Sequence, residues 1–214
     1  EMCIRDRLEA GQASVNSLPM QLSYGKGVRA GFRVHASSDN PWVQFGLTRK
    51  DLRHEKSVVL ALNPARERSD TGVPFYQFEV ANGSLLVDVP QTKNSPRQTY
   101  KHPIGILFDT GAYTTIHSSP TEAFPKRLSQ DRAGVQVSRG ANVVLFGDQS
   151  KDRRDHKQTE VFSLKSGNKI DKNLVTLQTT NNFYINTGIL PFLSQDLIYD
   201  LKGGRLHLVP RRRR

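Results

Sequence analysis

The sequence predicts an all-β protein that is built mostly of antiparallel strands and has few short helices. Short runs of apolar, β-branched and aromatic residues recur along the 214 residues. Glycine, proline, asparagine, aspartate and serine separate these runs, which is the pattern of strands joined by turns. No internal repeat and no heptad pattern is present, so we expect a low helix content.

The first half of the chain supplies five expected strand segments. They lie at 30–36, 42–47, 57–62, 75–90 and 104–108. Alternating apolar residues in the fourth segment flank Asn82-Gly83, a dipeptide typical of two-residue turns, so this segment is predicted to be a hairpin. A polar loop is expected at 91–103.

The second half begins with a Ser-Pro-x-Glu pattern, which predicts a short helix at 119–128. Further strands are expected at 142–148, 160–164, 174–180 and 181–188. The chain then contains a short helical turn and a final hairpin around Gly203-Gly204, because paired glycines between apolar runs favour a turn.

The chain carries 31 Lys and Arg residues against 20 Asp and Glu residues, a formal charge of +11. Much of the excess lies in 151–157 and in the basic tail 211–214, and we expect both to be solvated segments. No aromatic residues are interspersed there, so no nucleic-acid partner is expected. No apolar stretch approaches the roughly 20 residues that span a bilayer, so no membrane partner is expected.

The beginning of the chain carries little information about the fold. Residues 1–13 are predicted to be a non-native or disordered segment, since the first seven resemble translated adapter sequence and the chain starts with Glu, as a fragment does. No signal-peptide core is present. Cys3 is the single cysteine, so no intrachain disulfide can form. The histidines show no metal-ligand spacing, and we expect neither a metal nor a cofactor.

The stretch 104–117 reads "IGILFDTGAYTTIH" and contains the strongest candidate for chemistry. An apolar run leads to Asp109, and Gly111 follows two residues later. One interpretation is a strand that ends in an ordinary turn, because Asp and Gly dominate turns. The other is a carboxylate presented at the end of a buried strand, where neighbours tune its ionisation. A second Asp-Thr-Gly at 70–72 follows a polar run and is predicted to be a loop turn.

This loop and the later stretch "YINTGILPFLSQDLIYDLKGGRLHLVP" (184–210) together resemble the pepsin-like aspartic peptidases. In that family an Asp-Thr-Gly loop lies above a strand that ends in glycine. The C-terminal lobe is the closer match, with 198–200 and the hairpin 203–209 in the expected order. Residues 14–46 are similar to the lobe junction of plant-type, nepenthesin-like members.

The resemblance implies a domain layout and a set of site residues. Residues 14–29 would be the lobe junction and 30–210 a single C-terminal lobe of the pepsin-like acid-protease fold. The implied active-site loop consists of Asp109, Thr110, Gly111 and Ala112. Tyr113 and Thr114 would contact substrate, although a half-buried strand start explains them equally well. Ile185 and Gly188 would belong to the strand beneath the loop.

The activity that the resemblance implies is that of an aspartic endopeptidase. Two carboxylates share one proton, and the ionised one activates the water that attacks the peptide bond. This chain supplies only Asp109, so the second carboxylate is expected from a missing N-terminal lobe, and the chain alone is expected to be inactive. The partners would be that lobe and a peptide or protein substrate. The compartment is not readable from the sequence itself, and the resemblance implies a secreted or vacuolar protein.

The chain departs from the family pattern at three places. Val34-His35 stand where plant members have a cysteine, and Asn186-Thr187 replace an apolar pair before Gly188. Ala112 replaces a serine or threonine whose hydroxyl donates to the catalytic carboxylate. Two alternatives remain open: a non-catalytic binding or inhibitor protein on the same fold, like the xylanase inhibitors, and a homodimeric peptidase of the retroviral type.

Overall fold

A computed structural model describes residues 22–37, 39–53, 56–68, 72–93, 95–119, 124–125, 128–129, 136–150, 157–167 and 173–211. The predicted N-terminal segment 1–13 lies outside these residues, as do 14–21 of the predicted junction and 212–214 of the basic tail. Asp70, Thr71 and most of the predicted helix 119–128 also lie outside them. In the described part of the chain, no helix has both the length and the apolar character that crossing a membrane requires.

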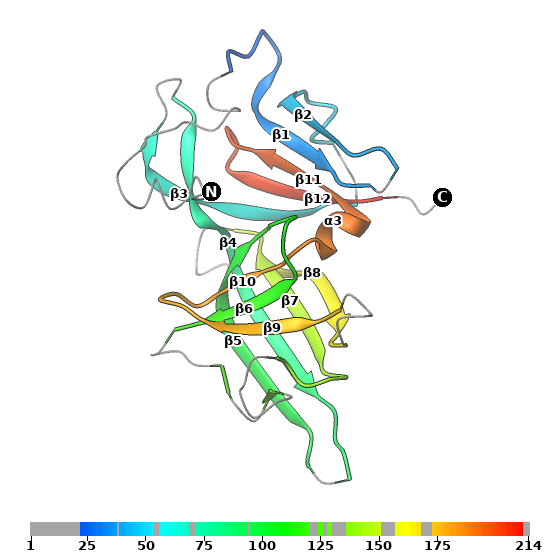
Figure 1. Ribbon diagram of the computed structural model, residues 1–214. Coiled ribbons are helices and arrows are strands. Elements are labelled where there is room, and N and C mark those ends of the chain that lie inside the picture. Colours follow the sequence, from blue (N-terminus) through cyan, green and yellow to red (C-terminus); the bar gives the residue numbers. More distant parts are fainter. Residues whose placement is uncertain are drawn as a thin grey trace.

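The all-β prediction is confirmed, because strands form nearly all of the regular structure (Figure 1). The strands are β1 (Arg29–His35), β2 (Trp42–Leu47), β3 (Val58–Arg68), β4 (Pro74–Val89), β5 (Gln98–Leu107), β6 (Thr114–Ser118), β7 (Asn142–Asp148), β8 (Gln158–Lys165), β9 (Val175–Thr179), β10 (Tyr184–Asn186), β11 (Gln195–Asp200) and β12 (Arg205–Pro210). One helix of five residues, α3 (Leu190–Ser194), is found among the described residues.

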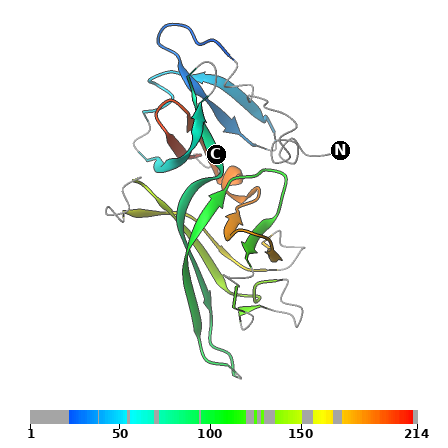
Figure 2. The ribbon, with the colours of Figure 1, turned by 90° about the vertical axis from the view of Figure 1, so that its left-hand side faces the viewer.

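The strands join into one mixed sheet with two regions (Figures 1 and 2). In the upper region of Figure 1 the order is β2-β1-β11-β12-β3, and every neighbouring pair is antiparallel. Strand β3 then pairs with β4, which begins the lower region. There β4 lies between β5 and β7, and β8 pairs with β7. The sheet therefore continues from one region to the other through β3.

The predicted hairpin at Asn82-Gly83 is wrong, because β4 continues through both residues. A Cβ atom on Gly83 would lie 1.9 Å from the carbonyl oxygen of Phe146 on β7. The glycine is therefore needed for the close approach of two strands rather than for a turn. The turn comes later, where the Thr92 N–H donates to the Ser95 carbonyl at 2.9 Å. Residues 98–103, predicted as loop, belong to β5.

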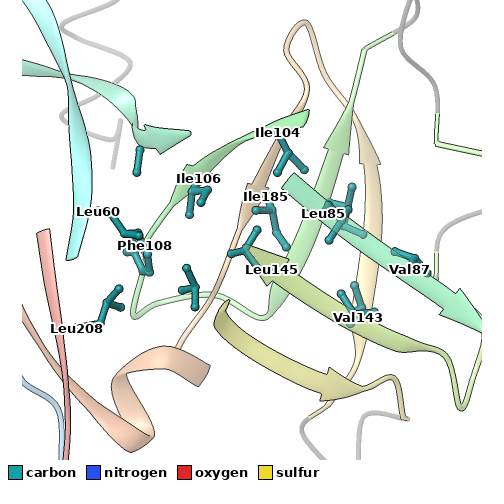
Figure 3. Packing of buried hydrophobic residues seen from close by; sticks show 14 of the residues in the cluster. Leu60, Leu85, Val87, Ile104, Ile106, Phe108, Val143, Leu145, Ile185 and Leu208 are labelled. Atoms are coloured by element: carbon teal, nitrogen blue, oxygen red, sulfur yellow. The ribbon is translucent and has the colours of Figure 1, made fainter. Parts of the chain in front are cut away.

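Both regions of the sheet contribute to one main hydrophobic core (Figure 3). Leu60 of β3 and Leu208 of β12 come from the upper region, while Leu85 of β4 and Leu145 of β7 come from the lower one. All four side chains are fully buried. Burial of a leucine side chain favours folding by about 1.5–3 kcal/mol, so the shared core holds the two regions together.

Candidate active site

The Asp109 loop joins β5 to β6, and buried residues hold both of its ends. Phe108 directly precedes the aspartate and is 8% exposed, and Ile116 follows on β6 and is fully buried. Both pack in the main core. Between these anchors Asp109 is half-buried, whereas Thr110 and Gly111 are exposed. The apolar run thus presents the carboxylate near the surface, directly after the end of β5 at which Ile104 and Ile106 are buried.

Strand β10 lies between the two strands that carry this loop. Ile185 pairs with Ile106 of β5 in the parallel direction and with Ile116 of β6 in the antiparallel direction. Strands β5 and β6 are therefore bridged by β10. Beyond the strand, the Thr187 N–H donates to the Leu107 carbonyl at 2.9 Å. The segment 184–189 thus passes beneath the loop, which agrees with the predicted arrangement.

Gly188 lies directly against the backbone of the loop. Its φ angle is +62°, in the left-handed region that favours glycine. A Cβ atom here would lie 2.5 Å from the Ala112 carbonyl oxygen and 2.9 Å from the Thr114 nitrogen. The next residue, Ile189, donates its N–H to the same Ala112 carbonyl at 3.2 Å. The glycine therefore permits the close contact that holds the loop above β10.

Two N–H donors contact the two oxygens of the Asp109 carboxylate. The Gly111 backbone N–H donates to Oδ1 at 2.8 Å, and the side-chain amide of Asn186 donates to Oδ2 at 3.0 Å. The Asn186 carbonyl oxygen Oδ1 in turn accepts the Gly188 N–H at 2.9 Å. Asn186 is 8% exposed. The carboxylate is thus oriented by its own loop and by the strand below.

The contact between Asn186 and Asp109 was not predicted from the sequence, although a signal for it was present. Asn186 lies in a short strand whose three residues are all buried. A buried amide needs hydrogen-bond partners, because burying it without them costs about 1–3 kcal/mol. The polar residue in an apolar segment therefore indicated a partner, but the sequence did not identify which one.

The remaining predicted site residues fall into exposed and buried groups. Thr110 and Tyr113 are exposed, and the Tyr113 side chain is 53% accessible. Thr114 is only 2% exposed, and its hydroxyl donates to the Thr187 carbonyl at 3.0 Å. This placement departs from the substrate contact expected for Thr114 and agrees with the alternative, a strand start. Ala112 is half-buried and contributes its carbonyl to Ile189.

The described residues contain no group of three or more His, Cys, Asp or Glu side chains that could hold a metal ion. The Asp109 carboxylate is the candidate for chemistry at this loop, because the residue is half-buried and both of its oxygens accept from N–H donors. A half-exposed carboxylate whose two oxygens are held by N–H donors can accept a hydrogen bond from a water molecule and can act as a base toward it. Comparison of the sequence with protein-family models and with curated proteins found no match.

Proposed function

We propose that this chain is one lobe of a two-lobed aspartic endopeptidase and that Asp109 is one of its two catalytic carboxylates. The passage of β10 between β5 and β6, directly beneath the Asp109-Thr110-Gly111 loop, is the observation that carries the proposal. This arrangement brings together the Asp109 loop and the segment that ends at Gly188. Each of these two segments resembles one part of the peptidase signature.

The proposed reaction needs a second carboxylate from a lobe outside these 214 residues. Two carboxylates at contact distance share one proton, because both cannot stay ionised. The ionised member takes a proton from water as the water oxygen attacks the peptide carbonyl, and the protonated member donates to that carbonyl oxygen. In this scheme Thr110 contacts the second lobe, and the exposed Tyr113 lies at the edge of the substrate site.

The test compares the isolated chain with a protein that contains both lobes. We expect the two-lobed protein to cleave a denatured protein substrate and the isolated chain to leave it intact. Asp109→Asn in the two-lobed protein should lower kcat by about 10⁴-fold or more, since the dyad acts as a unit. Asp88→Asn is the matched control, because this carboxylate pairs with Arg97 on the β4–β5 hairpin.

Two results would overturn the proposal. One is cleavage by the isolated, monomeric chain, which would mean that a second lobe is unnecessary. The other is a two-lobed protein that shows no cleavage although both aspartates are present. That result would favour the alternative of a non-catalytic binding protein on the same fold.

A further inference from the structure

We infer that Asn186 is a positioning residue for Asp109 and that its side-chain amide holds the carboxylate in one orientation. The catalytic part of this inference rests on the proposed function, whereas the contact itself does not. The two side chains lie 77 positions apart in the sequence and meet at 3.0 Å. Asn186 belongs to β10, and Asp109 belongs to the loop above it.

The hydrogen bonds of Asn186 determine which end of its amide faces the carboxylate. The Gly188 N–H is a donor, so the group facing it must be the amide oxygen. The NH₂ group then points to Oδ2 of Asp109. A flipped amide would place NH₂ against N–H and oxygen against carboxylate, and both contacts would be repulsive. The orientation therefore follows from the donors and acceptors present.

The backbone around Asn186 is fixed on two sides. The residue pairs with Leu107 of β5 and with Thr115 of β6. Its side chain is buried, so its rotation is restricted. A donor that is held this way costs little ordering entropy when it binds the carboxylate, and such preorganised donors are the effective ones in active sites.

Asn186 also supplies a donor that the loop itself lacks. The resemblance to aspartic peptidases implies a hydroxyl donor at position 112, where this chain has alanine. Here Oδ1 receives the Gly111 N–H, and Oδ2 receives the Asn186 amide. The second donor thus comes from the strand beneath the loop instead of from the loop. Relative to the family pattern, the chain thus lacks a donor at Ala112 and has one at Asn186.

Other ionisable side chains lie on β5 and β6, the two strands that the loop connects. The His117 ring on β6 stacks on Tyr184 with a centroid distance of 4.1 Å, and the His102 ring on β5 stacks on Tyr100 at 5.7 Å. Lys101 of β5 is exposed and pairs in register with Leu86. Among the described residues, the hydrogen bonds that orient Asp109 are those from Gly111 and Asn186.

The first test uses the 214-residue chain and needs no activity. Titration of the carboxylate should move the side-chain amide resonances of Asn186 in nitrogen–proton NMR spectra, because ionisation changes the acceptor. In Asp109→Asn the Asn186 resonances should stay constant over the pH range in which the native resonances move. The Asn82 amide is the control, since it donates to the Asn63 side chain and no carboxylate. Asn186 resonances that stay constant in the native chain would overturn the inference.

The second test measures catalysis in the two-lobed protein. Loss of a hydrogen bond to a charged group lowers a rate by about 10- to 100-fold. Asn186→Leu should therefore lower kcat by this factor and change KM little, because Asn186 contacts Asp109 rather than substrate. Adding Ala112→Ser to this variant should raise its kcat again by at least about tenfold, because the serine hydroxyl then donates to the carboxylate in place of the amide. A merely structural defect would not respond to a serine in the loop.

The control is Asn182→Leu, because the Asn182 amide donates to the Glu79 carboxylate at 3.4 Å and Asn182 is exposed. We expect this variant to keep the native kcat. An active enzyme whose kcat survives Asn186→Leu would overturn the positioning role. The two-lobed protein could also show no cleavage while the Asn186 resonances still move with pH. That outcome would overturn the proposed function and leave the contact between Asn186 and Asp109 established.

Discussion

Gly188 meets two requirements that other residues cannot meet together. Its backbone has a φ angle of +62°, which costs a non-glycine residue roughly 1–2 kcal/mol. Its missing side chain also leaves space for the backbone of 112–114. The first requirement is local, whereas the second arises only when the loop lies on the strand. The residue therefore links the local backbone conformation to the position of Asp109.

Gly188→Ala should destabilise the protein by about 2–5 kcal/mol, because backbone strain adds to a steric clash. Gly27→Ala is the control, since its φ angle is +83° and no atom lies within 4 Å of the added Cβ. The control should lose only the strain, about 1–2 kcal/mol. Urea unfolding gives both values. Equal losses in the two variants would show that the contact with the loop is not tight.

Tyr199 lies half-buried on β11, where its phenol is less exposed to water than in the unfolded chain. Burial raises the pKa of this phenol above its ordinary value of about 10. The ring stacks on Phe32 with a centroid distance of 4.4 Å. Because the folded state favours the neutral form, ionisation favours the unfolded chain once the pH exceeds the ordinary value. This contribution to stability is therefore present at neutral pH and decreases as the pH rises above about 10.

Tyr199→Phe keeps the ring and removes the ionisable hydroxyl. We expect the variant and the native chain to have similar unfolding midpoints at pH 7. Above about pH 10 the native chain should become progressively less stable than the variant. Thermal unfolding between pH 7 and 11 measures the difference. Parallel pH curves for the two proteins would mean that Tyr199 ionises as easily in the folded state as in the unfolded one.

At the scale of elements, one buried carboxylate joins three parts of the upper sheet region. Asp196 on β11 is 3% exposed and forms an ion pair with Arg33 of β1. The His35 ring also contacts it, with Nδ1 and Oδ1 2.7 Å apart. Arg211, which follows β12, approaches it at 3.4 Å. The carboxylate thus connects β1 and the residue that follows β12 to β11.

Asp196→Asn should lower the free energy of unfolding by about 2–4 kcal/mol, because two arginines lose their buried counter-charge. This expected loss is smaller than the loss for a fully buried ion pair, because the Arg33 and Arg211 side chains are about one-fifth exposed. Asp88→Asn removes the exposed pair with Arg97 and should leave the urea midpoint nearly unchanged. The same loss in both variants would contradict a special contribution from the Asp196 cluster.

The strands show which elements could be predicted from the sequence. The strand at 142–148 was predicted with the bounds that the structure gives β7, because a run of apolar residues there ends at Gly147-Asp148. Strand β4 was divided wrongly, since Asn-Gly is a turn signal and Gly83 instead serves a close contact with β7. A local pattern does not distinguish these two uses of glycine, because the second depends on β7, where Gly83 pairs with Gly147.

The candidate site was predictable to a similar extent. The loop at Asp109 and the strand before Gly188 were both identified, since the resemblance connects them in order. Two details depend on contacts between distant parts of the chain. The burial of Thr114 depends on its hydrogen bond to Thr187, and the orientation of Asp109 depends on Asn186. Both are contacts between side chains and distant backbone or side-chain atoms, which spacing along the sequence does not specify.

At the scale of the whole molecule, β3 connects the two regions of the sheet. Its residues 58–61 pair with β12, and its residues from Leu62 onward pair with β4. Leu60 of this strand is fully buried in the core that both regions share. Because the main core contains side chains from both regions, we expect the described part of the chain to unfold in one cooperative transition.

Leu60→Ala should lower the free energy of unfolding by about 2–5 kcal/mol, as the loss of a buried leucine does. Trp42, the single tryptophan, lies on β2 at the far end of the sheet and stacks on His35. In Leu60→Ala, the unfolding midpoints measured by Trp42 fluorescence and by far-ultraviolet circular dichroism should shift together to a lower urea concentration. A fluorescence transition that stays at its native midpoint would show that the two regions unfold separately.

The late position of β10 in the sequence has a consequence for the order of events during synthesis. The ribosome completes β5, Asp109 and β6 well before it adds the strand that belongs between them. Asn186 is incorporated 77 residues after Asp109, which takes roughly 4–15 s at about 5–20 residues per second. During that interval the carboxylate lacks its second donor and the strand beneath it. A nascent or truncated chain that ends before residue 186 therefore carries the aspartate without an assembled site.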